Sequence, residues 1–167
     1  MDIFDPQHYA ATRLPLHKAS PLPGWCYVSP EWYQREVDGL FRKDWLCVGR
    51  AEQVPNPGDF FSIEFVGQPL IVVRDESNQV RVHSAICRHR GAIITEDQGK
   101  CRAFVCPYHS WTYSLSGKLV STPGNPPPMA GCEGFRPADF GLTPIRAEQW
   151  AGFIFVTFNE DAPPLRE

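Results

Sequence analysis

Two cysteines and two histidines near the middle of the chain have the residue types and the spacing to bind a metal cluster. They lie in the segment HSAICRHRGAIITEDQGKCRAFVCPYHSW, and they are Cys87, His89, Cys106 and His109. Each pair joins one cysteine to one histidine, and 16 residues separate the two pairs. Thiolates and imidazoles are both ligands of transition metals. Because glycine and proline favour tight turns, Gly91 and Pro107 predict that each pair lies in a loop beside a strand.

The mixed composition of each pair indicates a centre with two metal ions. If two facing loops each supply one sulfur and one nitrogen, one iron can take both sulfurs and the other both nitrogens. That division of ligands is typical of a Rieske 2Fe-2S centre. A structural zinc site uses the same residue types, but its usual spacing groups cysteine with cysteine and histidine with histidine. Four unrelated buried side chains are the other alternative.

The rest of the chain must fold so that the two loops face each other, and a helix is expected to precede them. Ser29 can cap the first turn of a helix, and Pro30 suits its first position, where the missing N–H is harmless. The apolar residues that follow recur at helical spacing and predict one apolar stripe: Tyr33, Val37, Leu40 and Phe41. The helix is therefore expected over residues 30–43, after an N-terminal arm rich in proline.

Short segments rich in β-branched and aromatic residues follow the helix, with turn clusters between them. Strands are expected in WLCVGR (45–50), DFFSIEFV (59–66), PLIVVRD (69–75), QVRVHSA (79–85), CRAFVC (101–106), WTYSL (111–115), GKLVS (117–121) and WAGFIFVTF (150–158). Gly117 marks a hairpin turn, and residues 123–141 are expected to form a loop. Short strands at this density predict a mainly β fold, an antiparallel β-sandwich or small barrel.

The composition is that of an ordinary globular domain, with 43% hydrophobic residues, 21% charged residues and a formal net charge of −3. The charges of both signs are interspersed, so we expect no nucleic-acid partner. No apolar run approaches the roughly 18 residues of a membrane span, so we expect no membrane partner. The N-terminus lacks the apolar core of a secretory signal, which favours a cytoplasmic location.

The motifs CRHRG and CPYHSW resemble the signature of the Rieske non-haem iron, or aromatic ring-hydroxylating, oxygenases. The resemblance is to the N-terminal Rieske 2Fe-2S domain of their alpha subunit. It extends to SPEWYQREVDGLFRKDWLCVGR, PNPGDFFSIEFVGQPLIVVRD and WAGFIFVTFNEDAPPL, and thus to nearly the whole chain. It implies a Rieske-type fold with a cluster-binding subdomain, and one 2Fe-2S cluster on the four ligands named above. The expected division is an arm and helix (1–44), a Rieske domain (45–160) and the start of a linker (161–167).

The resemblance also implies a function in electron transfer. Such a domain accepts single electrons from a reductase or ferredoxin and passes them to a mononuclear non-haem iron in a C-terminal catalytic domain, often in the neighbouring subunit of a trimer. His109 is the last histidine of the chain, so the two-histidine, one-carboxylate site for that iron is not expected here. The chain would then be an incomplete component of a mono- or dioxygenase, without catalytic residues of its own. The alternatives are a stand-alone Rieske ferredoxin, which usually lacks the arm and helix, and a zinc-stabilised binding module.

The residues beside the ligands predict the reduction potential of the centre. Respiratory Rieske proteins, which resemble this chain at the ligands, carry a disulfide between the loops, whereas Ala92 and Tyr108 stand at those positions here. Trp111 replaces the serine that donates to a cluster sulfur in those proteins, and Tyr113 keeps a hydroxyl. Because hydrogen bonds to the sulfurs raise the potential, we expect a value near about −150 mV or somewhat above.

Other residues of reactive type receive a structural interpretation. Arg88, Arg90 and Lys100 are interpreted as a solvated loop, and His83 is expected to pack or form a hydrogen bond locally. The remaining cysteines are interpreted as buried thiols without chemistry: Cys26, Cys47, Cys101 and Cys132. Cys101 is expected on the same strand as Cys106.

Overall fold

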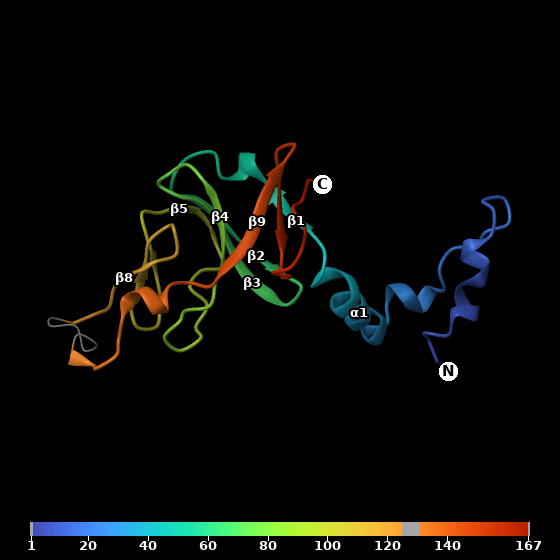
Figure 1. Ribbon diagram of the computed structural model, residues 1–167, viewed down its shortest axis with the longest axis horizontal. Coiled ribbons are helices and arrows are strands. Elements are labelled where there is room, and N and C mark those ends of the chain that lie inside the picture. Colours follow the sequence, from blue (N-terminus) through green and yellow to red (C-terminus); the bar gives the residue numbers. More distant parts are fainter. Residues whose placement is uncertain (1, 125–130, 167) are drawn as a thin grey trace. The chain divides into compact units, whose positions relative to one another are not determined.

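The computed structural model describes residues 2–124 and 131–166 (Figure 1). The chain divides into two compact units, Met1–Lys43 and Asp44–Glu167. In the described part of the chain, no helix has the length and apolar content that a bilayer span requires.

The first unit is built from short helices. Two 3-10 helices, η1 (Pro6–Arg13) and η2 (Gly24–Tyr27), precede the helix α1 (Pro30–Glu36). The Ser29 hydroxyl accepts a hydrogen bond from the Trp32 amide at 3.2 Å, which confirms the predicted start of the helix. A wider π turn, η3 (Val37–Phe41), continues α1, so the helical segment ends two residues before the predicted residue 43.

The predicted apolar stripe of this helix is only partly right. Val37 is buried, but Tyr33 and Leu40 are 51% and 55% exposed. The π turn has more residues per turn than an α-helix, so residues on either side of it cannot keep one common face. Stacked and edge-on rings supply the apolar contacts of this unit instead, with centroids 5.3–5.9 Å apart among Phe4, Tyr9, Trp25 and Trp32.

The second unit consists of two antiparallel sheets (Figure 1). The larger sheet is curled into a half-barrel and, among the described residues, has the strand order β1 (Leu46–Arg50), β10 (Phe153–Thr157), β9 (Pro144–Trp150), β4 (Val80–Ser84), β3 (Gln68–Arg74), β2 (Asp59–Phe65) and β5 (Gln98–Lys100). The smaller sheet contains β6 (Phe104–Val105), β7 (Thr112–Tyr113) and β8 (Leu119–Ser121). Among the described residues, the 3-10 turns η4 (Ala51–Gln53) and η6 (Pro137–Phe140) lie in the connections. This architecture confirms the predicted mainly β, antiparallel fold class with a separate cluster-binding part.

The central strand β3 explains why this unit has two cores. Its residues from Leu70 to Val73 are all nearly inaccessible, because alternate side chains enter opposite faces of the sheet. Leu70 and Val72 belong to an aliphatic core with β1, β4 and β10. Ile71 and Val73 belong to a second core that is shared with the smaller sheet. The cysteines of both predicted ligand pairs lie in this second core.

Two strands were not predicted from the sequence. The β5 sequence QGK has no apolar residue, and β9, PIRAEQW, carries charged residues at alternate positions. Each is held in the sheet by neighbouring strands: β5 pairs with β2, and β9 pairs with β10 and β4. Tertiary pairing therefore overrides the weak local preference of these segments.

Other expectations have mixed outcomes. The hairpin at Gly117 is confirmed, with the Gly117 amide donating to the Ser114 carbonyl at 2.9 Å and a φ of +84°. Of the expected strand 101–106, only β6 is a strand. Residues 125–130 of the expected loop 123–141 lie outside the described residues. The interpretation of four buried thiols is correct only for Cys26, since the cysteines at positions 47 and 132 are exposed and the one at 101 is half-buried and outside β6.

Candidate metal centre

The two cysteine–histidine pairs lie in two loops with the same backbone hydrogen bonds. In the first ligand loop, residues 87–92, the Cys87 amide donates to the Ala92 carbonyl at 2.8 Å and the Gly91 amide donates to the Cys87 carbonyl at 3.0 Å. In the second ligand loop, residues 106–111, the amide of Cys106 donates to the Trp111 carbonyl at 2.8 Å. The amide of Ser110 donates back to the Cys106 carbonyl at 2.9 Å. Each loop therefore closes on its own cysteine.

Both loops also require a left-handed backbone at the fourth residue after the cysteine. That residue is Gly91 in the first ligand loop, with a φ of +73°, and Ser110 in the second, with a φ of +57°. Glycine adopts this conformation freely, whereas serine does so at a cost of about 1 kcal/mol. Both loops therefore form the same hydrogen-bonded turn, but the left-handed position is a glycine in the first loop and a serine in the second.

The two cysteines are the buried part of the site. Cys87 and Cys106 are each 2% exposed and belong to the same core, and neither forms a disulfide. The Tyr113 hydroxyl lies 3.2 Å from the Cys87 sulfur and accepts a hydrogen bond from the Arg88 amide at 3.1 Å. Burial, followed by the contact with Cys87, raises the pKa of Tyr113, so the phenol keeps its proton and can donate it to a thiolate.

The two histidines, one from each ligand loop, lie against each other. The ring centroids of His89 and His109 are 4.7 Å apart, with the rings nearly perpendicular. Trp111 stacks on His89 at 4.7 Å with an interplanar angle of 6°, and Tyr108 packs against His109 at 3.8 Å. The structure therefore brings the two histidines together from the two loops, while both cysteines belong to the second core.

The side chains fit a 2Fe-2S cluster. Nδ1 of His89 and Nδ1 of His109 are both buried and have no hydrogen-bond partner among the described residues. Leaving two such nitrogens unpaired is costly, and bonds to a metal would satisfy both lone pairs. Burial, followed by the neighbouring His109, lowers the pKa of His89, so its ring is neutral and able to bind a metal.

The four predicted ligands, two sulfurs and two nitrogens, are the number that a two-iron centre needs. Within residues 2–124 and 131–166, no three histidine, cysteine, aspartate or glutamate side chains are gathered closely enough to hold one metal ion. A tetrahedral zinc site with protein ligands alone needs four such groups around one ion. A 2Fe-2S cluster needs only two protein ligands for each iron, since bridging sulfides complete the coordination.

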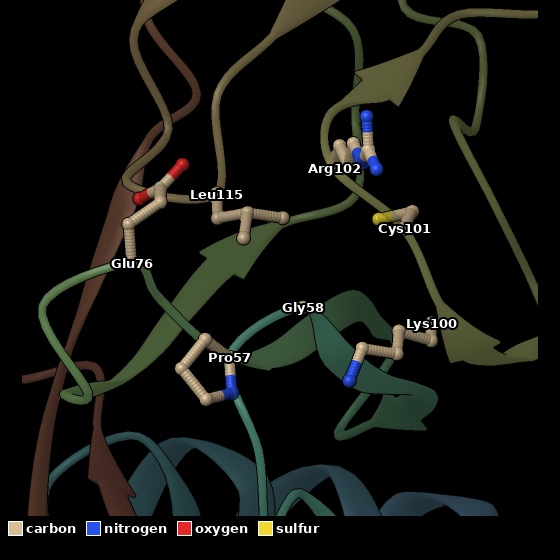
Figure 2. Close-up of a pocket in the computed structure, with 7 residues that line it drawn as sticks. All are labelled: Pro57, Gly58, Glu76, Lys100, Cys101, Arg102 and Leu115. Carbon is tan, nitrogen blue, oxygen red and sulfur yellow. The ribbon is translucent and has the colours of Figure 1, made fainter.

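A pocket of 780 Å³ elsewhere in the second unit is separate from this site (Figure 2). None of the four predicted ligands lines it; its walls come from Pro57, Gly58, Glu76, Lys100, Cys101, Arg102 and Leu115. Lys100 also lies 3.7 Å from a carboxylate oxygen of Asp59. Burial raises the pKa of Cys101, which favours the protonated thiol in this pocket.

Two features of the site escaped the sequence analysis. One is the left-handed Ser110, because serine gives no local signal for this conformation. The other is the stacking of Trp111 on His89, which joins the two ligand loops across the site. A repeat of cysteine followed four residues later by a turn residue is visible in the sequence and could have indicated the shared loop geometry.

Comparison with known proteins agrees with this geometry. Residues 44–141 match the family model of the Rieske [2Fe-2S] domain. The chain is 34% identical over 153 residues to chloroplastic choline monooxygenase of Arabidopsis thaliana, covering 92% of this chain and 34% of that protein. It is 36% identical over 140 residues to the alpha subunit of biphenyl 2,3-dioxygenase of Rhodococcus jostii, covering 83% of this chain and 30% of that subunit. The chain thus spans about a third of the length of these curated relatives.

Solved structures show the same similarity in three dimensions. The apo form of a quaternary ammonium Rieske monooxygenase has a TM-score of 0.78 and 27% identity, covering 87% of this chain and 41% of that one. Naphthalene 1,2-dioxygenase from Rhodococcus sp., bound to indole, has a TM-score of 0.78 and 29% identity, covering 86% of this chain and 33% of that one.

Proposed function

Because the chain belongs to the Rieske [2Fe-2S] domain family, we propose that it is the electron-transfer domain of a Rieske non-haem iron oxygenase alpha subunit. In this proposal Cys87 and Cys106 bind one iron of the cluster, and His89 and His109 bind the other. The observation that carries the assignment is the close approach of His89 and His109, one from each ligand loop, with ring centroids 4.7 Å apart and Nδ1 of both rings buried and unpartnered. Both thiols lie in one core.

The surroundings of the four ligands suit the transfer of one electron at a time. A bound 2Fe-2S cluster supplies a centre that gains and loses single electrons. The buried cysteines keep their end of the site away from water, and Trp111 covers one face of the His89 ring. The histidine residues are half-buried, so their end of the site is the one that a redox partner can approach.

The partners in this proposal follow from the relatives. Choline monooxygenase and biphenyl 2,3-dioxygenase are oxygenases, and the chain corresponds to about a third of each. We propose that a reductase or ferredoxin reduces the centre, and that the electron passes to a mononuclear iron in a C-terminal catalytic domain. In a trimer, that catalytic domain would belong to the neighbouring subunit. The proposed location is the cytoplasm. The chain supplies no catalytic residue of its own in this scheme.

Anaerobic reconstitution of the purified chain tests the proposal. We expect two irons and two sulfides per chain, a coloured protein, and a paramagnetic signal after one-electron reduction. The variant His109→Cys should keep a cluster with an altered spectrum and a lower potential, because a charged thiolate replaces a neutral imidazole. As a matched control, Cys47→Ser alters an exposed cysteine and should leave iron content unchanged. A colourless protein that binds zinc instead would overturn the assignment.

A further inference from the structure

His83 joins the two sheets of the second unit through a buried hydrogen bond. It lies on β4, four residues before Cys87, and is 3% exposed. Its Nε2 lies 3.2 Å from the carbonyl oxygen of Leu115, in the turn between β7 and β8. Because a carbonyl oxygen only accepts, Nε2 carries the proton and donates it. The bond therefore ties the larger sheet to the turn of the smaller sheet.

The same turn is held from two sides. On one side the His83 ring lies so close to Gly117 that a Cβ there would be 2.7 Å from Cε1 and 2.9 Å from Nδ1. On the other side the Leu142 amide donates to the Gly117 carbonyl at 2.7 Å. A Cβ on Gly141 would lie 3.0 Å from that same carbonyl oxygen. The turn is therefore in close contact with both β4 and the segment that leads into β9.

The turn is only two residues from the hydroxyl that reaches the proposed cluster ligand. Tyr113 ends β7, and its hydroxyl lies 3.2 Å from the Cys87 sulfur. A hydrogen bond weakens steeply as its distance and angle depart from the optimum. A small displacement of the β7–β8 turn would therefore weaken the contact between Tyr113 and Cys87.

Burial is the main reason why the His83 ring is neutral. Burial lowers the pKa of His83, and Arg81 on the same strand lowers it further, whereas the Leu115 carbonyl and Asp75 act in the opposite sense. Lys118 from the β7–β8 hairpin and Arg146 from β9 line the two cavities beside the ring, of 460 and 330 Å³. A neutral ring with its proton on Nε2 matches the single acceptor that the structure offers.

We propose that His83 is a positioning residue that sets the reduction potential of the cluster by holding the β7–β8 turn, and with it the Tyr113 hydroxyl, against Cys87. The inference rests on the proposed function, in which Cys87 binds iron. A hydrogen bond to a ligand sulfur stabilises the reduced, more negative state of a cluster. Loosening the turn should therefore lower the potential without removing the ligands.

A double-mutant cycle of midpoint potentials at neutral pH tests this inference. His83→Phe keeps a ring but loses the donor, and we expect a lower potential and an altered paramagnetic spectrum with the cluster retained. His83→Gln keeps a donor near Nε2 and should restore both. In the Tyr113→Phe background, His83→Phe should shift the potential no further. Equal shifts with and without the Tyr113 hydroxyl, or no shift at all, would overturn the proposal.

A second variant covers the case in which His83→Phe does not fold. Gly117→Ala places a methyl group against the His83 ring and should lower the potential only while Tyr113 is present. His17→Phe, at an exposed histidine of the first unit, is the matched control and should change nothing. A wild-type chain that takes up no cluster would contradict the proposed function, whereas a normal cluster with unaltered potentials in both variants would contradict the role of His83 alone.

Discussion

The two ligand loops use one backbone design with different side chains. Each closes through amide–carbonyl hydrogen bonds on its own cysteine and turns through a left-handed residue four positions later. The histidine, however, follows the cysteine by two positions in the first ligand loop and by three in the second. The loop backbone therefore positions the cysteines, while the different spacing of the histidines brings the two imidazoles toward each other.

The loops also differ in what surrounds their cysteines. Cys87 lies beside the Tyr113 hydroxyl, whereas the structure records no side-chain hydrogen bond to the Cys106 sulfur in residues 2–124 and 131–166. The two sulfurs of one iron would then have unequal environments. The sequence had indicated Tyr113 as the single hydroxyl donor, and its hydroxyl lies beside the Cys87 sulfur.

The largest effect is expected from removing either cysteine, which tests whether the two loops are equally necessary. Cys87→Ser and Cys106→Ser each remove one of the four proposed ligands, and both side chains are buried. Bound iron should fall by more than about tenfold in both variants. Metal analysis and visible absorption after reconstitution measure this. Full cluster content in one variant would show that the corresponding loop is dispensable.

Asp75 lies at the opposite end of β4 from the first ligand loop, and it is expected to affect the stability of the fold without affecting the cluster. Burial raises its pKa, but hydrogen bonds from Arg81, Ser77 and Gln79 outweigh burial and lower the pKa to about 2. Since the ordinary value is higher, the ionised carboxylate stabilises the fold above about pH 4, by about 2 kcal/mol. That contribution is lost as the pH falls toward 2.

Asp75→Asn should therefore reduce the free energy of unfolding by about 2 kcal/mol at pH 7. The difference from wild type should shrink as the pH approaches 2, and the cluster potential should not change. Denaturant unfolding followed by circular dichroism at several pH values measures the first two effects. A difference that persists undiminished near pH 2 would show that the Asp75 carboxylate is not responsible.

The unequal surroundings of the two sulfurs predict a change in potential for Tyr113→Phe. Loss of the hydroxyl removes a hydrogen bond to Cys87 and should lower the midpoint by about 60 mV, a tenfold change in a one-electron equilibrium. Tyr108→Phe removes an exposed hydroxyl within the second ligand loop and serves as the control. Potentiometric titration should show the shift in the first variant and not in the second; equal shifts would mean that the contact with Cys87 is not the cause.

The smallest effects concern the left-handed residue of each loop. Gly91→Ala meets no atom within 4 Å, so its cost should come only from the positive φ and reach about 1 kcal/mol. Ser110→Gly should relieve the corresponding strain and be neutral or stabilising by up to about 1 kcal/mol. The thermal unfolding temperature should fall for Gly91→Ala and should not fall for Ser110→Gly. A loss of stability in both variants would show that Ser110 makes a compensating contact.

The sequence predicted the dense apolar strands and the start of the helix, because these depend on neighbours in the chain. PLIVVRD became the doubly buried strand β3, and Ser29 capped the helix as expected. It failed at QGK and PIRAEQW, whose strand state depends on pairing with distant segments. It also failed for Cys47, because the burial of one side chain on a strand depends on which face another element covers.

For the candidate site, residue types and spacing predicted a set of donors and their distribution over two loops, since both are local properties. Which atoms come into contact depends on the packing of the whole unit. The Tyr113 hydroxyl reaches Cys87 across 26 positions, and His83 reaches Leu115 across 32. Such contacts arise from the register of the strands and the packing of two sheets on a shared core, which no short stretch of sequence encodes.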